Sequence, residues 1–339
     1  MERTTQLVGQ SSSFLDAVEL ASRAAPLDRP VLVVGERGTG KELVAERLHH
    51  LSERWDGPFV VTNCAALPET LIEAELFGHE AGAFTGATKA RAGRFEEADG
   101  GTLFLDELAT LSSAAQDRLL RAVEYGEVTR IGASRPITID VRIVAATNED
   151  LPRLVEEGRF RADLLDRLSF EVVTLPPLRH RRSDILVLAD HFGRRMAVEL
   201  EWPGWPGFGE AASASLQAYQ WPGNVRELRN VVERAVYRWA ETGRPIERIE
   251  FDPFASPWRP AAPEPKAAPA DPKTDAPAAP PPPHDPAACA DLRLAIAEYE
   301  KAILAAALER CRWNQRAAAA ALSLTYDQLR HAMKRHALG

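Results

Sequence analysis

The sequence of 339 residues has little cysteine and no long apolar run. Its three cysteines, Cys64, Cys289 and Cys311, are far apart and form no CxxC pair, which argues against a disulfide framework or a zinc site and fits a reducing compartment. No apolar run reaches the ~20 residues of a membrane span, and the N-terminus lacks the basic-then-apolar pattern of a secretory signal. We therefore expect a cytoplasmic protein that is not inserted in a membrane.

Positive charge is also scarce, because 41 Lys and Arg face 49 Asp and Glu, for a net charge of -8. The distribution is uneven, since residues 291–339 hold 8 basic and 5 acidic residues. A small basic tail on an acidic body predicts that any nucleic acid is held by the tail.

Proline is concentrated in one stretch. Residues 253–286 hold 13 of the 25 prolines, so this stretch cannot build a packed core and is expected to be an extended linker. Before it, apolar runs at 31–34, 59–61, 102–105, 141–145 and 170–173 alternate with helical patterns such as 41–51 and 114–125. This order predicts an α/β fold with a mainly parallel sheet.

After Pro176-Pro177 the pattern becomes helical over 183–200, 210–219 and 224–240, which predicts a small helical lid. We expect four parts: an α/β subdomain at 1–175, the lid at 176–252, a disordered linker at 253–290 and an all-α tail at 291–339.

A glycine-rich loop follows the first predicted strand and leads into a helix. It consists of Gly35, Glu36, Arg37, Gly38, Thr39, Gly40 and Lys41, followed by Glu42. Such a loop can present backbone N–H groups to phosphate oxygens, with the lysine on the outer phosphates. The usual Ser or Thr after the lysine is replaced by Glu42, so one magnesium ligand is missing and a purely structural glycine turn remains an alternative.

Two carboxylates, Asp106 and Glu107, end the strand at 102–105. Asp106 can hold Mg²⁺ through water, and Glu107 can polarise an attacking water. Together with the loop, this pair predicts an ATPase; without the loop, two surface acids would be the better interpretation.

Other polar residues lie at strand ends, where doubly wound sheets bind ligands. Asn63 ends the second strand, and Thr147-Asn148 end the fourth, although each also suits an ordinary turn. Arg161 and Arg167 could be arginine fingers or a surface ladder with Asp163 and Asp166. Arg226 could contact the nucleotide from the lid or pair with Glu227 or Glu233.

A hexapeptide between the two halves of the predicted site has no acid or base. It reads Gly82, Ala83, Phe84, Thr85, Gly86 and Ala87. This composition predicts a flexible loop tip with one apolar side chain, suited to contact the target of a nucleotide-driven machine.

The tail predicts a helix-turn-helix, with helices over about 291–312, 314–322 and 326–336 and Thr325 as the N-cap of the recognition helix. The candidate DNA contacts are Thr325, Tyr326, Gln328, Arg330 and Lys334. A helical dimerisation module with a solvated basic face is the alternative.

These motifs, in this order, resemble the AAA+ family of bacterial enhancer-binding proteins, which activate sigma-54 RNA polymerase. The resemblance covers residues from about 7 to 250 and continues in the tail, which is similar to Fis-type DNA-binding domains, although Ser323 stands where their turn usually has Gly. The Gly82–Ala87 hexapeptide is the family's hallmark, and Glu42 in place of Ser or Thr is usual in it.

The resemblance implies a role for each position. The loop from Gly35 to Glu42 binds ATP, Asp106 orders magnesium, and Glu107 activates water, with Asn63 holding Glu107 inactive until the γ-phosphate is sensed. Thr147-Asn148 and Arg226 are sensors, and Arg161 and Arg167 act across the interface of a hexameric ring. Phe84 and Thr85 contact sigma-54 from a loop inserted into the helix that starts near Glu69, which couples hydrolysis to promoter opening.

Within the family, Arg37 and the stretch Ser52-Glu53-Arg54-Trp55 resemble the activators of phage-shock stress operons. No room is left for a receiver or sensory domain, so control is expected in trans, independently of a two-component system. The resemblance implies phage-shock protein A as negative regulator, docking at Trp55; a loop aromatic packed on its own domain is the alternative.

Two other functions remain open from the residues alone. One is an AAA+ remodeller of another kind, such as a helicase loader or unfoldase with a DNA tether. The other is a helix-turn-helix regulator whose ATP fold only switches oligomeric state. Neither requires the hexapeptide, which therefore favours the ATP-hydrolysing activator.

Overall fold

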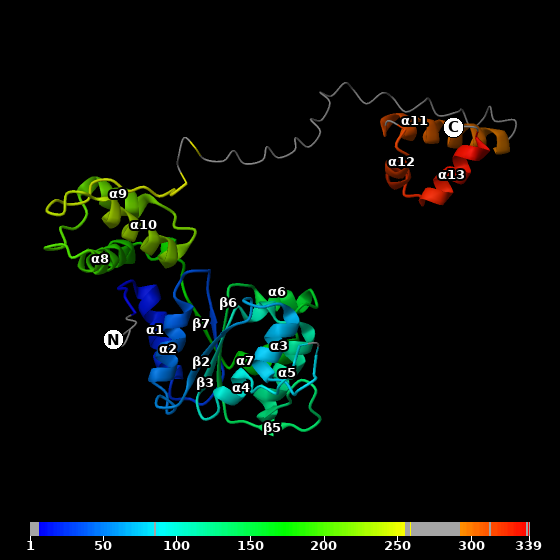
Figure 1. Cartoon of the computed structure of the whole chain (residues 1–339). Helices are drawn as coiled ribbons and strands as arrows, with labels where there is room; N and C mark the ends of the chain where they lie inside the picture. Colours follow the sequence, from blue (N-terminus) through cyan, green and yellow to red (C-terminus); the bar gives the residue numbers. More distant parts are fainter. Residues whose placement is uncertain are drawn as a thin grey trace. The chain divides into compact units, whose positions relative to one another are not determined.

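The computed structural model of the chain describes residues 7–84, 86–254, 258, 292–311, 313–336 and 338. The chain divides into two compact units, with the division after Phe254 (Figure 1), and each has its own buried apolar residues. Most of the predicted proline-rich linker lies outside the described residues. None of the described helices is both long and apolar enough to cross a membrane.

The α/β part of the first unit contains, in chain order, α1 (Ser12–Ala24), β1 (Val31–Val34), α2 (Lys41–His50), β2 (Phe59–Asn63), α3 (Glu69–Phe77), α4 (Arg94–Glu97), β3 (Thr102–Asp106), η1 (Leu108–Thr110), α5 (Ser113–Tyr125), β4 (Glu127–Val128), β5 (Ile137–Thr138), β6 (Arg142–Thr147), α6 (Leu151–Glu156), α7 (Ala162–Leu168) and β7 (Glu171–Thr174). The sequence predicted five of these strands with ends within about two residues of those observed.

Those five strands form one sheet in the order β2-β3-β6-β1-β7, and every neighbouring pair is parallel. The predicted parallel sheet is therefore confirmed. Because the strands are parallel, their carboxyl ends lie along one edge of the sheet, and this edge holds Val34, Asn63, Asp106 and Thr147.

Helices cover both faces of this sheet (Figure 1). Leu103 and Leu105 pack on the side of α3, α5 and α7, whereas Phe104, between them, packs on the side of α1 and α2. This alternation follows from the period of two along a strand. With apolar residues on both faces, the central strands are continuous apolar runs, which made them visible in the sequence.

The short antiparallel pair β4 and β5 was not predicted. Each strand has two residues, too few to show an alternating pattern.

The rest of the first unit is a helical lid with η2 (Leu178–His180), α8 (Ser183–Glu199), α9 (Glu210–Ala218) and α10 (Asn224–Arg238). These elements pack around the fully buried Trp221, whose indole N–H donates to the Leu216 carbonyl at 2.9 Å. The three lid helices predicted from the sequence are present, each ending one or two residues earlier than expected.

The second unit consists of α11 (Leu292–Arg310), α12 (Gln315–Ala321) and α13 (Tyr326–Arg335) around a small core that includes Leu308 and Leu329. Thr325 is the N-cap of α13, as predicted: its hydroxyl accepts from Gln328 N, and the Gln328 side chain accepts from Thr325 N. Ser323, in the turn before α13, has a left-handed backbone with φ of 55°. The predicted helix-turn-helix fold is confirmed.

Candidate functional site

The phosphate-type loop connects the carboxyl end of β1 to the start of α2. Gly38 and Gly40 have φ of 77° and 101°, which a residue with a Cβ adopts only at a cost. The Lys41 ammonium donates to the carbonyls of Gly35 at 2.9 Å and Glu36 at 3.3 Å. The loop is thus folded around its own lysine, with the start of α2 behind it.

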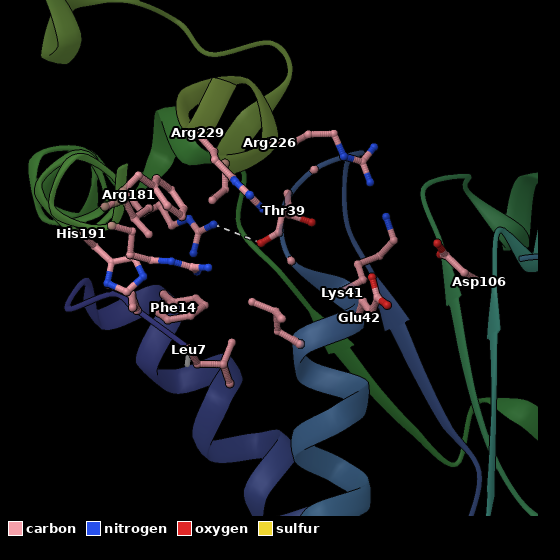
Figure 2. Close-up of a pocket in the computed structure, with 18 residues that line it drawn as sticks. Leu7, Phe14, Thr39, Lys41, Glu42, Asp106, Arg181, His191, Arg226 and Arg229 are labelled. Atoms are coloured by element: carbon pink, nitrogen blue, oxygen red, sulfur yellow. Dashed lines mark hydrogen bonds between the residues drawn. The ribbon is translucent and has the colours of Figure 1, made fainter. Parts of the chain in front are cut away.

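Asp106 lines the same cavity as Lys41, and both side chains lie at the end of it away from Phe14 and His191 in Figure 2. Burial lowers the pKa of Lys41 below its usual value, and the charges of Asp106 and Glu107 oppose that shift. Glu107 follows β3 in a left-handed conformation with φ of 55°, and its carboxylate lies 3.5 Å from the Arg37 guanidinium. Lysine and carboxylates therefore share one site, as expected from the sequence.

Glu42, directly after the lysine, also lines this cavity. Burial raises the pKa of its carboxyl, and the nearby charges of Glu46 and Asp106 raise it further.

The polar strand-end residues lie beside the loop. Thr147 is fully buried; its carbonyl accepts from Gly35 N at 3.1 Å. The Asn148 side-chain oxygen is buried and has no hydrogen-bond partner among the described residues. Asn63 is paired in register with Asp106, but its side-chain oxygen accepts from Ala65 N at 2.9 Å, and the carboxylate of Glu107 faces Arg37 instead.

Arg226 approaches from the lid. It follows the start of α10, where the N–H groups of Val225 and Arg226 donate to the Gly38 carbonyl at 2.9 and 3.3 Å. Its side chain lines the cavity, and no hydrogen bond or ion pair of its guanidinium occurs within the described ranges. The two carboxylates considered as its partners are engaged elsewhere, Glu227 with Gly223 N and Tyr219, and Glu233 with Arg229.

The cavity has a volume of about 410 Å³ and an apolar end formed by residues that the sequence did not single out. This end is lined by Leu7, Val8, Phe14, Leu188, Phe192 and Val225. Arg181, on the lid, is 2 % exposed, donates to the Thr39 carbonyl at 3.2 Å and stacks over Phe14 (Figure 2). No local sequence signal marked Arg181, because its partners lie more than 140 residues away.

This arrangement fits a nucleoside triphosphate. Glycine-loop N–H groups, a buried lysine and a free lid arginine lie at one end of the cavity, and apolar side chains that could hold the base lie at the other, beside Arg181 and His191. Asp106 and Glu107 could serve a magnesium ion that arrives with the phosphates. No group of three or more His, Cys, Asp or Glu side chains able to hold a metal by itself occurs in the described part of the chain.

The other two candidate arginines do not line this cavity: Arg161 is the N-cap of α7, and Arg167 lies in its last turn. Arg161 pairs with Asp163 at 2.6 Å and Asp117 at 2.5 Å, and Arg167 pairs with Glu124 at 2.6 Å. Asp163 was expected as a partner, whereas Asp117 and Glu124 come from α5. These arginines cannot serve the cavity described above, so any catalytic role requires a neighbouring subunit.

The hexapeptide lies between α3 and α4, outside the nucleotide cavity. Gly82 N donates to the Ala87 carbonyl at 2.7 Å and Ala87 N to the Phe84 carbonyl at 3.0 Å. The Phe84 ring packs edge-on against His79, with 5.0 Å between ring centroids, and remains 38 % exposed. Thr85 lies outside the described residues. The loop thus presents an accessible aromatic side chain.

Trp55 is 64 % exposed, in the turn between α2 and β2. This exposure argues against a loop aromatic packed on its own domain.

The tail presents its predicted DNA contacts on the surface. Thr325, Tyr326, Gln328, Arg330 and Lys334 are all exposed. Thr325 and Gln328 also form the cap of α13, and the Tyr326 hydroxyl bonds to Gln315 at 3.2 Å. Arg330 and Lys334 are one helical turn apart on α13, so they share a face.

Comparison with known families matches three segments of the chain. Residues 7–174 match the Sigma-54 interaction domain, residues 179–260 the AAA+ ATPase lid domain, and residues 295–336 the Bacterial regulatory protein, Fis family.

Individual relatives agree with these matches. The chain is 53 % identical over 335 residues to the Psp operon transcriptional activator of Escherichia coli K12, covering 99 % of both chains. It is 53 % identical over 230 residues to the transcriptional regulatory protein ZraR of Salmonella typhimurium, which is 68 % of this chain and 52 % of ZraR. The crystal structure of NtrX from Brucella abortus in complex with ATP superposes with a TM-score of 0.68 at 31 % identity, covering 98 % of this chain and 70 % of NtrX. The chain therefore belongs to the sigma-54-dependent transcription activators, which combine an AAA+ ATPase domain with a Fis-type helix-turn-helix.

Proposed function

We propose that the protein hydrolyses ATP to convert closed promoter complexes of sigma-54 RNA polymerase into open complexes, acting in the cytoplasm from enhancer DNA bound upstream. The observation that carries this proposal is the separation of two features in one unit. The cavity at Lys41 is suited to ATP, and the exposed Phe84 lies on a loop outside that cavity. Hydrolysis and contact with the polymerase are therefore assigned to different residues.

In this proposal the loop from Gly35 to Glu42, which includes Lys41, binds the triphosphate. Thr147, Asn148 and Arg226 sense its phosphates. Asp106 would hold Mg²⁺, which neutralises phosphate charge. Glu107 orients and deprotonates the attacking water; its ion pair with Arg37 must loosen for this. Asn63, which is paired in register with Asp106, would take part in that change.

The test uses purified protein, sigma-54 RNA polymerase, a supercoiled promoter and ATP, with open complexes detected by permanganate footprinting. Thr85→Ala should keep ATP hydrolysis within about twofold and lose open complexes, since none of the hexapeptide residues that the structure describes lines the cavity. Thr88→Ala, at the residue directly after Ala87, is the matched control. Normal activation by Thr85→Ala would refute the coupling role of the loop.

We further propose that the active form is a ring, a hexamer, in which Arg161 and Arg167 reach the ATP of the neighbouring subunit. Their carboxylate partners on the same subunit are exposed, and such pairs contribute little to stability, so they are easily exchanged. Arg161→Ala subunits should regain part of their ATP hydrolysis when they are mixed with Lys41→Ala subunits. The Lys41→Ala subunits cannot hydrolyse ATP themselves, but their arginines are intact. Absence of rescue at every mixing ratio would refute action in trans.

For the tail, we propose that residues 291–339 bind the enhancer as dimers, with residues 253–290 as a linker. Supporting this, α11 exposes Ile296, Tyr299 and Ile303 at helical spacing, a stripe that suits helix–helix contact. Deleting 253–339 should spare ATP hydrolysis and abolish the enhancer footprint. A footprint that survives the deletion would place DNA binding elsewhere.

The likeness to the Psp operon transcriptional activator leads us to propose phage-shock stress promoters as targets and phage-shock protein A as inhibitor. Trp55 would be the docking residue, because exposed tryptophans are enriched at binding hot spots. Trp55→Ala should remove inhibition by added phage-shock protein A without changing basal hydrolysis. Inhibition of the variant at the wild-type level would refute the docking site.

A further inference from the structure

The second residue of the phosphate loop, Glu36, binds the lid. Arg179, on η2, donates two parallel hydrogen bonds to its carboxylate at 2.6 and 2.8 Å, and Asn224, the first residue of α10, donates a third at 3.0 Å. Paired N–H···O bonds of this kind are among the stronger and more directional side-chain contacts. Both oxygens of Glu36 are therefore committed to the lid rather than to the cavity.

The charge of Glu36 fits this role. Hydrogen bonds from Arg179 and then from Asn224 lower the pKa of Glu36 to about 2, so it is ionised at neutral pH. A free carboxylate in a phosphate loop would repel the phosphates, whereas one neutralised by Arg179 does not. Glu36 is thus compatible with the loop only while the lid arginine is in place.

Asn224 transmits this contact to Arg226. Asn224 is fully buried, has a left-handed backbone with φ of 53°, and its side chain also accepts from Leu178 N and donates to the Arg37 carbonyl. These bonds fix the first turn of α10 on the loop, and Arg226 is two residues further along that turn. Arg226 has no described partner that could hold its side chain over the cavity by itself.

We propose that Glu36 is a positioning residue for Arg226: by binding Arg179 and Asn224, it holds the lid arginine over the phosphate end of the cavity. This inference rests on the proposed function only in that the ligand of the cavity is ATP. It reassigns Glu36, expected from the sequence to bind the nucleotide, to act through the lid.

The test is a double-mutant cycle. It measures the affinity of the full-length protein for a fluorescent ATP analogue, in a hydrolysable and a non-hydrolysable form. Glu36→Gln removes the charge and should weaken binding about tenfold. Arg226→Ala should weaken it by a similar factor, and the double variant no further than the worse single variant, because both changes remove one contact. Glu156→Gln, an exposed carboxylate on α6 with no described ion pair, should bind as the wild type does.

If Glu36 had a merely structural role, the two losses of affinity would be independent and would multiply in the double variant. That result would overturn the proposal, and so would wild-type affinity in Glu36→Gln. If Glu36→Gln fails to fold, Arg179→Gln removes the same bonds from the lid side and must show the same coupling to Arg226. A wild-type protein that binds the analogue but does not hydrolyse ATP would refute the proposed function and leave this cycle decisive.

Discussion

Two glycine-rich loops of this protein use glycine for different reasons. At Gly38, in the phosphate loop, an added Cβ would lie 2.4 Å from the Gly223 carbonyl oxygen of the lid. At Gly82 and Gly86, in the hexapeptide, an added Cβ would meet nothing within 4 Å. All three have positive φ, between 77° and 101°. The first loop requires glycine for space as well as conformation, the second for conformation alone.

The difference shows how ligand binding and partner contact are divided between the two loops. The phosphate loop is tied to the lid by Glu36, Arg37 and Gly38, so its shape depends on an element far away in the sequence. The hexapeptide is shaped by its own short turn and the packing of Phe84 on His79. A loop with few external ties is suited to change conformation when a partner binds, whereas the phosphate loop is suited to hold a ligand still.

The largest expected effect separates the ATP site, to which the phosphate loop and Glu107 belong, from the hexapeptide. Glu107→Gln should lower kcat for ATP hydrolysis by about 10²–10⁴, because it removes the group that takes the proton of the attacking water, and ATP binding should persist. Phe84→Ala should leave kcat within about twofold while abolishing open complexes. Steady-state phosphate release and permanganate footprinting measure the two outcomes.

Near-normal turnover by Glu107→Gln would move the catalytic base to another residue. A large loss of hydrolysis in Phe84→Ala alone would break the comparison, because the hexapeptide would then be part of the ATP site.

The next effect tests the two uses of glycine. Gly38→Ala should weaken ATP binding by about tenfold to a hundredfold, because the methyl group collides with Gly223 and forces the lid away from the loop. Gly86→Ala faces no collision and should keep ATP affinity within about twofold, while reducing open complexes through its unfavourable φ. Equilibrium binding of a fluorescent ATP analogue to both variants checks the contrast, and equal losses of affinity would contradict it.

The part that the sequence predicted was local. Continuous apolar runs marked the central strands β1, β3 and β6, since these are buried on both faces, whereas the edge strands β2 and β7 are partly exposed. Thr325 with Gln328 three residues later marked the cap of α13. The parallel order then placed Asp106 beside Asn63 at one sheet edge.

The residues that the sequence did not reveal are those that depend on how the lid packs against the phosphate loop. Arg179 and Arg181 were not singled out in the sequence, yet they bind the phosphate loop from more than 140 residues away. No periodicity encodes such a contact, because it requires knowing which lid turn meets the loop. Asn224 was likewise given no role from the sequence, since its left-handed backbone and buried amide are visible only in the fold.

Acid should affect the two loops differently. The pKa of Glu36 is lowered from 4.5 to about 2, so its contribution to the free energy of unfolding is complete above pH 4.5 and is lost as the pH falls towards 2. Its side chain is 41 % exposed, so solvent screening limits this contribution to about 1 kcal/mol. The difference in free energy of unfolding between the wild type and Glu36→Gln, measured in urea, should therefore shrink as the pH falls from about 5 to about 3.

Phe84→Ala is the control from the other loop, because residues Gly82–Ala87 include no ionisable side chain. Its stability difference from the wild type should be the same at both pH values. A Glu36→Gln difference that does not change with pH would contradict the ion pair with the lid.

The smallest effect applies the comparison to the tail, where a left-handed position holds a side chain. Ser323 has φ of 55° and is exposed, so its Cβ strains the turn without filling a space. Ser323→Gly should stabilise the helix-turn-helix by about 1 kcal/mol, the relief of strain exceeding the entropy cost of glycine. Amide hydrogen exchange in α12 and α13 of the full-length chain should slow by roughly fivefold. Ser323→Ala keeps the Cβ and should show no gain. Faster exchange in the glycine variant would mean that flexibility of the unfolded chain outweighs backbone strain, and that positive φ alone does not call for glycine in this turn.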